Sequence, residues 1–196
     1  MNPMQRSVMM LLQVVCALAA LASLQGCVPL VATGVGAAVL MADDRRTAGI
    51  YVEDETIENK AQLRINSKYS DGVHVNVTSY NRIALLTGEA SSPEVRADIE
   101  RIVREIPNVR TAQNELAVTP TTTYMLRGND SVLTSKVKAR FVDANKFRAN
   151  HVKVVTENGV VYLLGLVSRQ EAAAATEIAR TTGGVQRVVR VFEYTD

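Results

Sequence analysis

Cysteine, histidine and tryptophan are scarce in this chain of 196 residues, which has two cysteines, two histidines and no tryptophan. It also lacks a Gly-x-Ser-x-Gly nucleophile elbow and a His-Glu-x-x-His zinc motif. The histidines, His74 and His151, occupy matching places before two apolar segments, where a structural role is more frequent than catalysis. We therefore expect neither enzymatic activity nor a bound metal or cofactor.

The net charge is also small, at +2, and gives no support for nucleic-acid binding by the whole chain. The remaining composition, with 47% hydrophobic and 21% charged residues, is ordinary for a soluble globular protein. The length suits one medium domain or two small ones.

The first part of the chain has the layout of a signal peptide. Residues 8–21 form an apolar run, broken only by Gln13, that is too short to be a convincing membrane-spanning helix. It is followed by Leu24-Gln25-Gly26-Cys27, which resembles the lipobox of bacterial lipoproteins. The resemblance implies that residues 1–26 are a cleaved signal peptide and that Cys27 carries a diacylglyceryl group and palmitate. The alternative is an uncleaved anchor or a chance occurrence of Leu-x-Gly-Cys.

The residues around Cys27 extend that expectation. Val28 stands where an Asp would retain an enterobacterial lipoprotein in the inner membrane, so the resemblance implies an outer-membrane location facing the periplasm. Cys16 lies in the segment that cleavage would remove, which leaves Cys27 without a disulfide partner. Residues 27–51, small and apolar up to residue 42, are interpreted as the lipidated cysteine and a tether.

An internal repeat follows the tether. Apolar residues at i, i+4 and i+8 predict a helix with one buried face at the start of each unit. At a shift of 76 positions the matching pairs are Asp54 with Asp130, Ile57 with Leu133, Lys60 with Lys136, Ala61 with Val137, and Ile65 with Phe141. We interpret Glu53, Asp54 and Glu55 as the beginning of the first helix, where negative charge is favourable.

Two strands joined by a tight turn are predicted next in each unit. The alternation in residues 73–78 predicts a half-buried strand, with residues 151–154 as its counterpart. Turns are predicted at Asn81-Arg82 and Asn158-Gly159, and the second is the stronger signal because both of its residues tolerate a positive φ. The returning strands, residues 83–88 and 160–165, end in glycines that match at a shift of 77.

A second helix and a last strand complete each unit. Ser92-Pro93 predicts one helix start, and Ser168 with Glu171 predicts a capping box at the other. The last strands are expected within residues 109–118 and 185–194. The fold class is therefore α+β, with an α-β-β-α-β unit used twice, in domains over residues 52–119 and 129–196 joined by a linker over residues 120–128.

This unit resembles the BON domain of bacterial envelope proteins. Two units behind a lipobox resemble the dual BON-domain outer-membrane lipoproteins associated with cell division and envelope stress. The matching pieces are the lipobox, Lys136-Val137, and residues 75–78, 152–154, 156–159 and 165–167. The resemblance implies two helices on a three-stranded mixed sheet in each domain, and a non-enzymatic module that binds anionic phospholipid, chiefly phosphatidylglycerol, through the first helix of the second domain. Relatives can carry a large aromatic residue where this chain has Val132, which implies weaker lipid binding here.

Charge and helix geometry bear on the same helix. Residues 52–118 contain 8 Lys and Arg against 11 Asp and Glu, whereas residues 125–196 contain 11 against 7. At about 100° per residue, the side expected to face the sheet holds Leu133, Val137, Phe141 and Ala144. The opposite side is predicted to bind lipid through Val132, Ser135, Lys136, Lys138, Ala139, Val142 and Lys146. The alternative is a solvated helix face, because surface valines are common.

Two functional hypotheses follow. The first is a lipoprotein that binds anionic phospholipid and supports envelope integrity and cell division. The second is a periplasmic adaptor for outer-membrane assembly machinery or cell-wall remodelling enzymes, which would use the acidic first unit or an exposed sheet face. Neither hypothesis involves nucleic acid.

Overall fold

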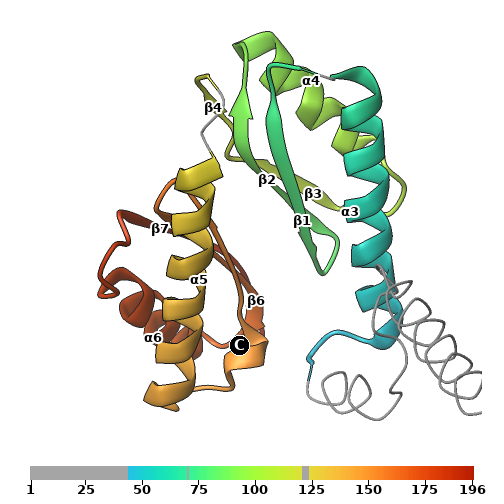
Figure 1. Cartoon of the computed structure of the whole chain (residues 1–196). Helices are drawn as coiled ribbons and strands as arrows, with labels where there is room; N and C mark the ends of the chain where they lie inside the picture. The colour runs from blue at the N-terminus through green and yellow to red at the C-terminus, as the bar shows by residue number, and fades with distance from the viewer. Residues whose placement is uncertain (1–43, 70, 121–123) are drawn as a thin grey trace, which may run out of the picture. The chain divides into compact units, whose positions relative to one another are not determined.

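The structure, a computed structural model, describes residues 44–69, 71–120 and 124–196, and only the backbone of residues 124–127 (Figure 1). The predicted signal peptide, Cys27 and most of the predicted tether lie outside the described residues. Asp43–Asp196 forms one compact unit that contains both repeats. Within the described ranges, no helix combines the length and the apolar character needed to cross a membrane.

The first repeat folds as two helices on one face of a small sheet (Figure 1). Its elements are α3 (Ala48–Lys68), β1 (His74–Tyr80), β2 (Ile83–Ala90), α4 (Pro93–Arg104), β3 (Thr111–Asn114) and β4 (Ala117–Val118). β2 is central, antiparallel to β1 and parallel to β3 and β4. The sheet is therefore mixed, as expected from the sequence.

The second repeat has the same topology. Its elements are α5 (Tyr124–Ala144), η1 (Ala149–His151), β5 (Lys153–Glu157), β6 (Val160–Val167), α6 (Arg169–Arg180) and β7 (Arg187–Tyr194). β6 pairs antiparallel with β5 and parallel with β7, and α5 and α6 cover one face of this sheet (Figure 1). The predicted α+β architecture of two α-β-β-α-β units is confirmed.

Several local predictions were wrong. α3 begins at Ala48 with Thr47 as its N-cap, so Glu53, Asp54 and Glu55 lie inside the helix rather than at its start. The last strand of the first repeat is split into β3 and β4, and the strand expected from His151 begins at Lys153 because His151 lies in η1. α5 begins at Tyr124, so the helix extends into the segment assigned to the linker, while the domain boundaries themselves stay a prediction.

A buried aspartate in each first helix holds the hairpin turn that follows. The Asp54 carboxylate accepts hydrogen bonds from the backbone N–H groups of Asn81 and Arg82, at 2.8 and 2.7 Å. Asp130 accepts from the corresponding groups of Asn158 and Gly159, at 2.8 and 2.9 Å. All four turn residues have positive φ. The recurrence of aspartate at a shift of 76 thus reflects turn anchoring rather than helix initiation.

Three apolar clusters stabilise the unit. Two lie between the helices and the sheet of each repeat, around Ile57, Ile65 and Ile99 in the first and Val137, Phe141 and Leu163 in the second. The third consists of Tyr80 and Leu85 from the first sheet with Tyr162, Leu164 and Val191 from the second. Because alternate strand residues point to opposite faces, the sheet faces left uncovered by helices meet in this third cluster.

Candidate functional site

The outer face of α5 has the composition predicted from the sequence. All seven candidate residues are exposed, and Val132 and Val142 leave 55% and 65% of their surfaces open to solvent. Lys146, which was predicted on this helix face, lies beyond the end of α5 instead. Leu133, Val137 and Phe141 are buried on the opposite side, as predicted. Ala144 was expected to be buried with them but is exposed, because it is the last residue of the helix and lies beyond the sheet contact.

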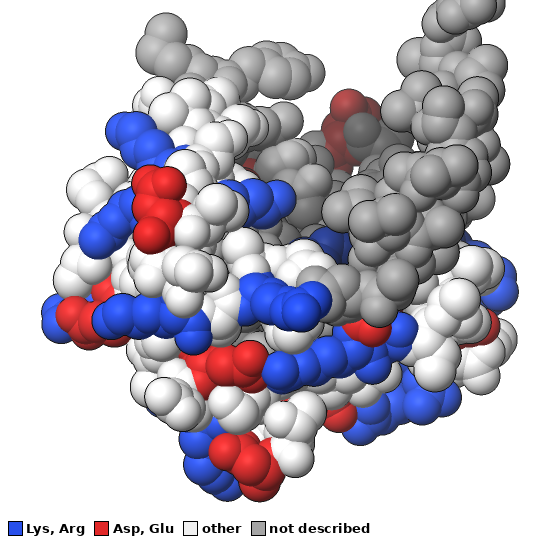
Figure 2. Space-filling view, turned by 90° about the horizontal axis from the view of Figure 1, so that it is seen from below, with Lys and Arg blue, Asp and Glu red and all other residues white. Residues whose placement is uncertain are grey.

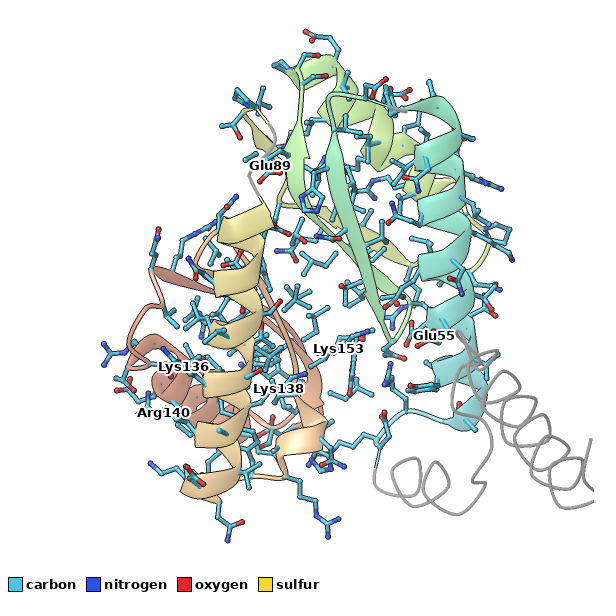
Figure 3. The ribbon with its side chains drawn as sticks, in the orientation of Figure 1. Glu55, Glu89, Lys136, Lys138, Arg140 and Lys153 are labelled. Carbon is cyan, nitrogen blue, oxygen red and sulfur yellow. The ribbon has the colours of Figure 1, made fainter. Side chains whose placement is uncertain are left out.

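The basic residues near α5 fall into two groups. Arg140 donates hydrogen bonds to the Ile178 carbonyl at 2.9 Å and to Thr182 Oγ1 at 2.7 Å, so it joins α5 to α6. Lys153 forms an ion pair with Glu58 at 2.9 Å. By contrast, Lys136, Lys138 and Lys146 have no ion-pair partner within the described part of the chain. Figure 3 shows Lys136, Lys138 and Arg140 along α5.

Two surface hollows flank this helix face. One, of about 600 Å³, is lined by Val132 and Lys136 of α5 together with Gly183, Gly184 and Gln186 of the loop after α6. The other, of about 440 Å³, includes Lys138 and Val142 together with Lys153. Each hollow places an exposed valine beside a lysine, but the second is also lined by Asp54, Glu55 and Glu58, so its charge is mixed.

The surface seen from below carries charges of both signs (Figure 2). Figure 2 shows Lys and Arg side chains intermixed with Asp and Glu side chains on the face that it presents, rather than one continuous basic surface. A site on α5 would therefore depend on its own lysines and valines, since oppositely charged neighbours reduce the long-range potential.

A second polar group, which the sequence did not reveal, lies where the sheets meet. It consists of His74, Glu89 and Glu157. One imidazole nitrogen and one oxygen from each carboxylate lie within 4.8 Å of one another. Burial, with a smaller contribution from the Glu89 carboxylate, raises the pKa of the Glu157 carboxyl. The signal that points to this cluster is Glu89 itself, a charged residue in the otherwise apolar strand β2.

The segment before α3 is tied to the second repeat. Nη1 and Nη2 of the Arg45 guanidinium donate to the Glu171 carboxylate, at 2.7 and 2.9 Å. These hydrogen bonds lower the pKa of Glu171 to about 2. Glu171 also accepts from the Ser168 backbone N–H, which completes the predicted capping box of α6.

Comparison with known proteins shows that both units of the repeat match one domain family. The BON domain family matches residues 53–120 and again residues 129–196. The chain is 36% identical to outer membrane lipoprotein DolP of Haemophilus influenzae, over 88% of this chain and 91% of that protein. It is 30% identical to the 21 kDa hemolysin of Actinobacillus pleuropneumoniae, over 77% of this chain and 79% of that protein.

The two matched segments cover the two α-β-β-α-β units except for the first residues of α3 and α5, and the similarity to DolP extends over most of both chains. The chain therefore belongs to the BON-domain family, as an outer-membrane lipoprotein with two BON domains in tandem.

Proposed function

We propose that this protein is a non-enzymatic lipoprotein that binds anionic phospholipid, chiefly phosphatidylglycerol, through the outer face of α5. Lipidation of Cys27 would hold it on the periplasmic side of the outer membrane, where it would support envelope integrity and cell division. The observation that carries the proposal is the combination of two exposed valines with lysines that have no acidic partner among the described residues.

The energies involved are modest but sufficient for selectivity. A basic residue near an anionic lipid surface contributes roughly 1 kcal/mol, screened by salt within about 10 Å. Insertion of a half-exposed valine would add about 1 kcal/mol. Three lysines and two valines therefore favour anionic regions by several kcal/mol at low salt. The acyl chains on Cys27 would provide attachment, and α5 would select the lipid.

Vesicle binding by residues 43–196, which form one compact unit without the lipid anchor, tests the proposal. We expect binding to phosphatidylglycerol vesicles that weakens with salt, and little binding to phosphatidylcholine vesicles. Lys136→Glu should weaken it roughly 30-fold, since about 2 kcal/mol of attraction is lost. Val142→Asp should weaken it at least about 10-fold.

The repeat supplies matched controls. Lys60 and Asn66 of α3 occupy the positions that correspond to Lys136 and Val142, and both are exposed. Lys60→Glu and Asn66→Asp introduce the same charges on the other domain and should leave vesicle binding within about 2-fold of the parent. Unchanged binding in both α5 variants, with circular dichroism showing a folded chain, would remove α5 as the lipid site.

The alternative function is an adaptor for outer-membrane assembly machinery or cell-wall remodelling enzymes. The adaptor hypothesis would use the acidic surface of the first domain to bind such a partner. It would not use an exposed sheet face, because in the described part of the chain the helix-free faces of the two sheets pack against each other. Crosslinking followed by pull-down with the Val142→Asp variant separates the two functions, since retained partner capture with lost lipid binding favours the adaptor.

A further inference from the structure

His74, Glu89 and Glu157 converge at the contact between the two domains, away from the outer face of α5. The strand register sets His74 of β1 directly opposite Glu89 of β2, and Glu157 is the last residue of β5. Nδ1 of His74 lies 3.1 Å from Oε2 of Glu89 and 4.0 Å from Oε1 of Glu157. One imidazole nitrogen and two carboxylate oxygens thus face a common point.

We propose that these three side chains bind one zinc ion, which joins the first BON domain to the second. Imidazole and carboxylate are both ordinary zinc ligands, with metal–ligand distances of about 2.0–2.2 Å. Ligand atoms in a tetrahedral site of that size are about 3.4 Å apart. The ligand atoms here lie within 4.8 Å of one another, so small side-chain rotations bring them to zinc-binding distances. A water molecule would complete the coordination.

Two amides orient the carboxylates as a zinc site requires. Nδ2 of Asn76 donates to Oε2 of Glu157 at 2.9 Å, and Nδ2 of Asn158 donates to Oε1 of Glu89 at 2.8 Å. Each carboxylate thus accepts an amide hydrogen bond on one oxygen and has its other oxygen nearer to Nδ1 of His74. Such outer hydrogen bonds fix ligand orientation in metal sites and typically change affinity 10- to 100-fold when they are removed.

The electrostatics of the cluster also favour a cation. The side chains of Glu89 and Glu157 are 0% and 8% exposed, and burying two neighbouring carboxylates is costly unless their charge is compensated. Thr87 lies on the same face of β2 as Glu89, and its buried hydroxyl has no hydrogen-bond partner among the described residues. A dication between the two carboxylates would offset their mutual repulsion.

The cluster is also accessible. A hollow of about 360 Å³ is lined by His74, Asn76 and Glu157 together with Asp130 and Ser131 of α5. This gives a hydrated ion a route to the ligands past acidic and polar groups. Zinc binding at this cluster is independent of lipid binding, because none of the three ligands lies on the outer face of α5.

Isothermal titration of the full chain in detergent with zinc chloride tests the site. We expect one equivalent of zinc to bind, and His74→Gln and Glu157→Gln each to weaken binding at least about 100-fold. Asn76→Ala, which leaves all three ligands in place, should weaken it about 10- to 100-fold. His151→Gln removes the equivalent histidine of the second domain and should bind zinc as the parent does.

Thermal unfolding provides a second measurement. Zinc at 100 times its dissociation constant should raise the melting temperature of the parent and of His151→Gln but not of His74→Gln. Absence of zinc binding by the parent at micromolar concentrations overturns the proposal. It is equally overturned if His74→Gln, shown to be folded by circular dichroism, binds zinc with parental affinity.

Discussion

The two BON domains differ most on the outer faces of their first helices. At the repeat shift of 76, Val132, Lys138 and Val142 of α5 correspond to Thr56, Gln62 and Asn66 of α3. The fold directs both sets away from the buried stripe of their helix, so the difference is one of chemistry and not of placement. At these three positions α5 has basic and apolar side chains where α3 has neutral polar ones, although α3 exposes Leu63 at the position of Ala139. The lipid proposal concerns the second domain because of this difference together with its excess of Lys and Arg.

Other features are nearly the same in both domains because the backbone requires them. A Cβ atom at Gly88 would collide with the carbonyl oxygen of His74, and one at Gly165 would collide with that of His151. Glycine recurs there because the backbone at His74 or His151 passes close to the returning strand, whereas the α5 surface is free to diverge. Comparison of the domains thus separates residues that the fold requires from residues that serve a ligand.

The largest expected effect comes from the aspartates that anchor the hairpins. Asp54 accepts from two backbone N–H groups and from Ser79 Oγ, and it also forms an ion pair with Arg46 at 2.8 Å. Among the interactions described, Asp130 accepts only the hydrogen bonds from the backbone N–H groups of Asn158 and Gly159. Asp54→Ala should therefore lower the free energy of unfolding by about 2–4 kcal/mol, because three buried donors lose their acceptor and Arg46 keeps only its ion pair with Asp44.

Asp130→Ala should cost less, about 1–3 kcal/mol, since only neutral donors lose their partner. Urea denaturation followed by circular dichroism measures both values, with the exposed Asp143→Ala as a control that should change stability by less than about 0.5 kcal/mol. Equal losses at Asp54 and Asp130 would show that the Arg46 ion pair and the Ser79 hydrogen bond together add nothing.

An intermediate effect is expected from exchanging residues between the two turns. Arg82 and Gly159 occupy the same turn position, with φ of 65° and 73°. Non-glycine residues are disfavoured there by about 1–2 kcal/mol. Gly159→Arg should therefore destabilise the protein by that amount in thermal or urea unfolding.

The reciprocal change, Arg82→Gly, should stabilise it by up to about 1 kcal/mol. Loss of the arginine side chain costs little, since its buried Nε has no hydrogen-bond partner among the described residues. A destabilised Arg82→Gly variant would indicate instead that the side chain contributes to packing in the first domain.

The smallest expected effect concerns acid stability. The pKa of Glu171 is about 2 in the folded chain, below its ordinary value of 4.5. Its interaction with Arg45 is therefore fully stabilising above about pH 4.5 and is lost as the pH falls towards 2. Glu171→Gln should reduce the loss of stability between these pH values, measured by urea denaturation across the range.

The first domain offers the comparison for this measurement. Hydrogen bonds from Lys68, Tyr69 and Arg101 lower the pKa of Asp98, so Asp98→Asn should also flatten the acid dependence of stability. The Asp98 contacts remain within the first domain, whereas the Arg45–Glu171 pair connects the segment before α3 to the second domain. An unchanged pH profile for Glu171→Gln would show that this connection does not contribute to folding stability in solution.

Much of the fold follows from periodic patterns in the sequence. The helix stripes, the alternation in the strands, the turn pairs Asn81-Arg82 and Asn158-Gly159 and the caps Ser92 and Ser168 are local signals, and each is present in the structure. The helix start at Ala48 was missed because its N-cap, Thr47, precedes a stretch without the apolar spacing of the later turns. The role of Asp54 was misinterpreted because its partners are about 25 residues away.

The sequence by itself determined the repeat, the α-β-β-α-β order and the outward direction of the α5 candidates, because short-range periodicity fixes which side of a helix or strand is buried. Only the tertiary structure decided which charges are paired and which groups converge. Lys153 is engaged with Glu58 while Lys136 remains without an acidic partner among the described residues, and His74, Glu89 and Glu157 meet from two domains. Such distances depend on how the sheets pack, and no local pattern encodes them.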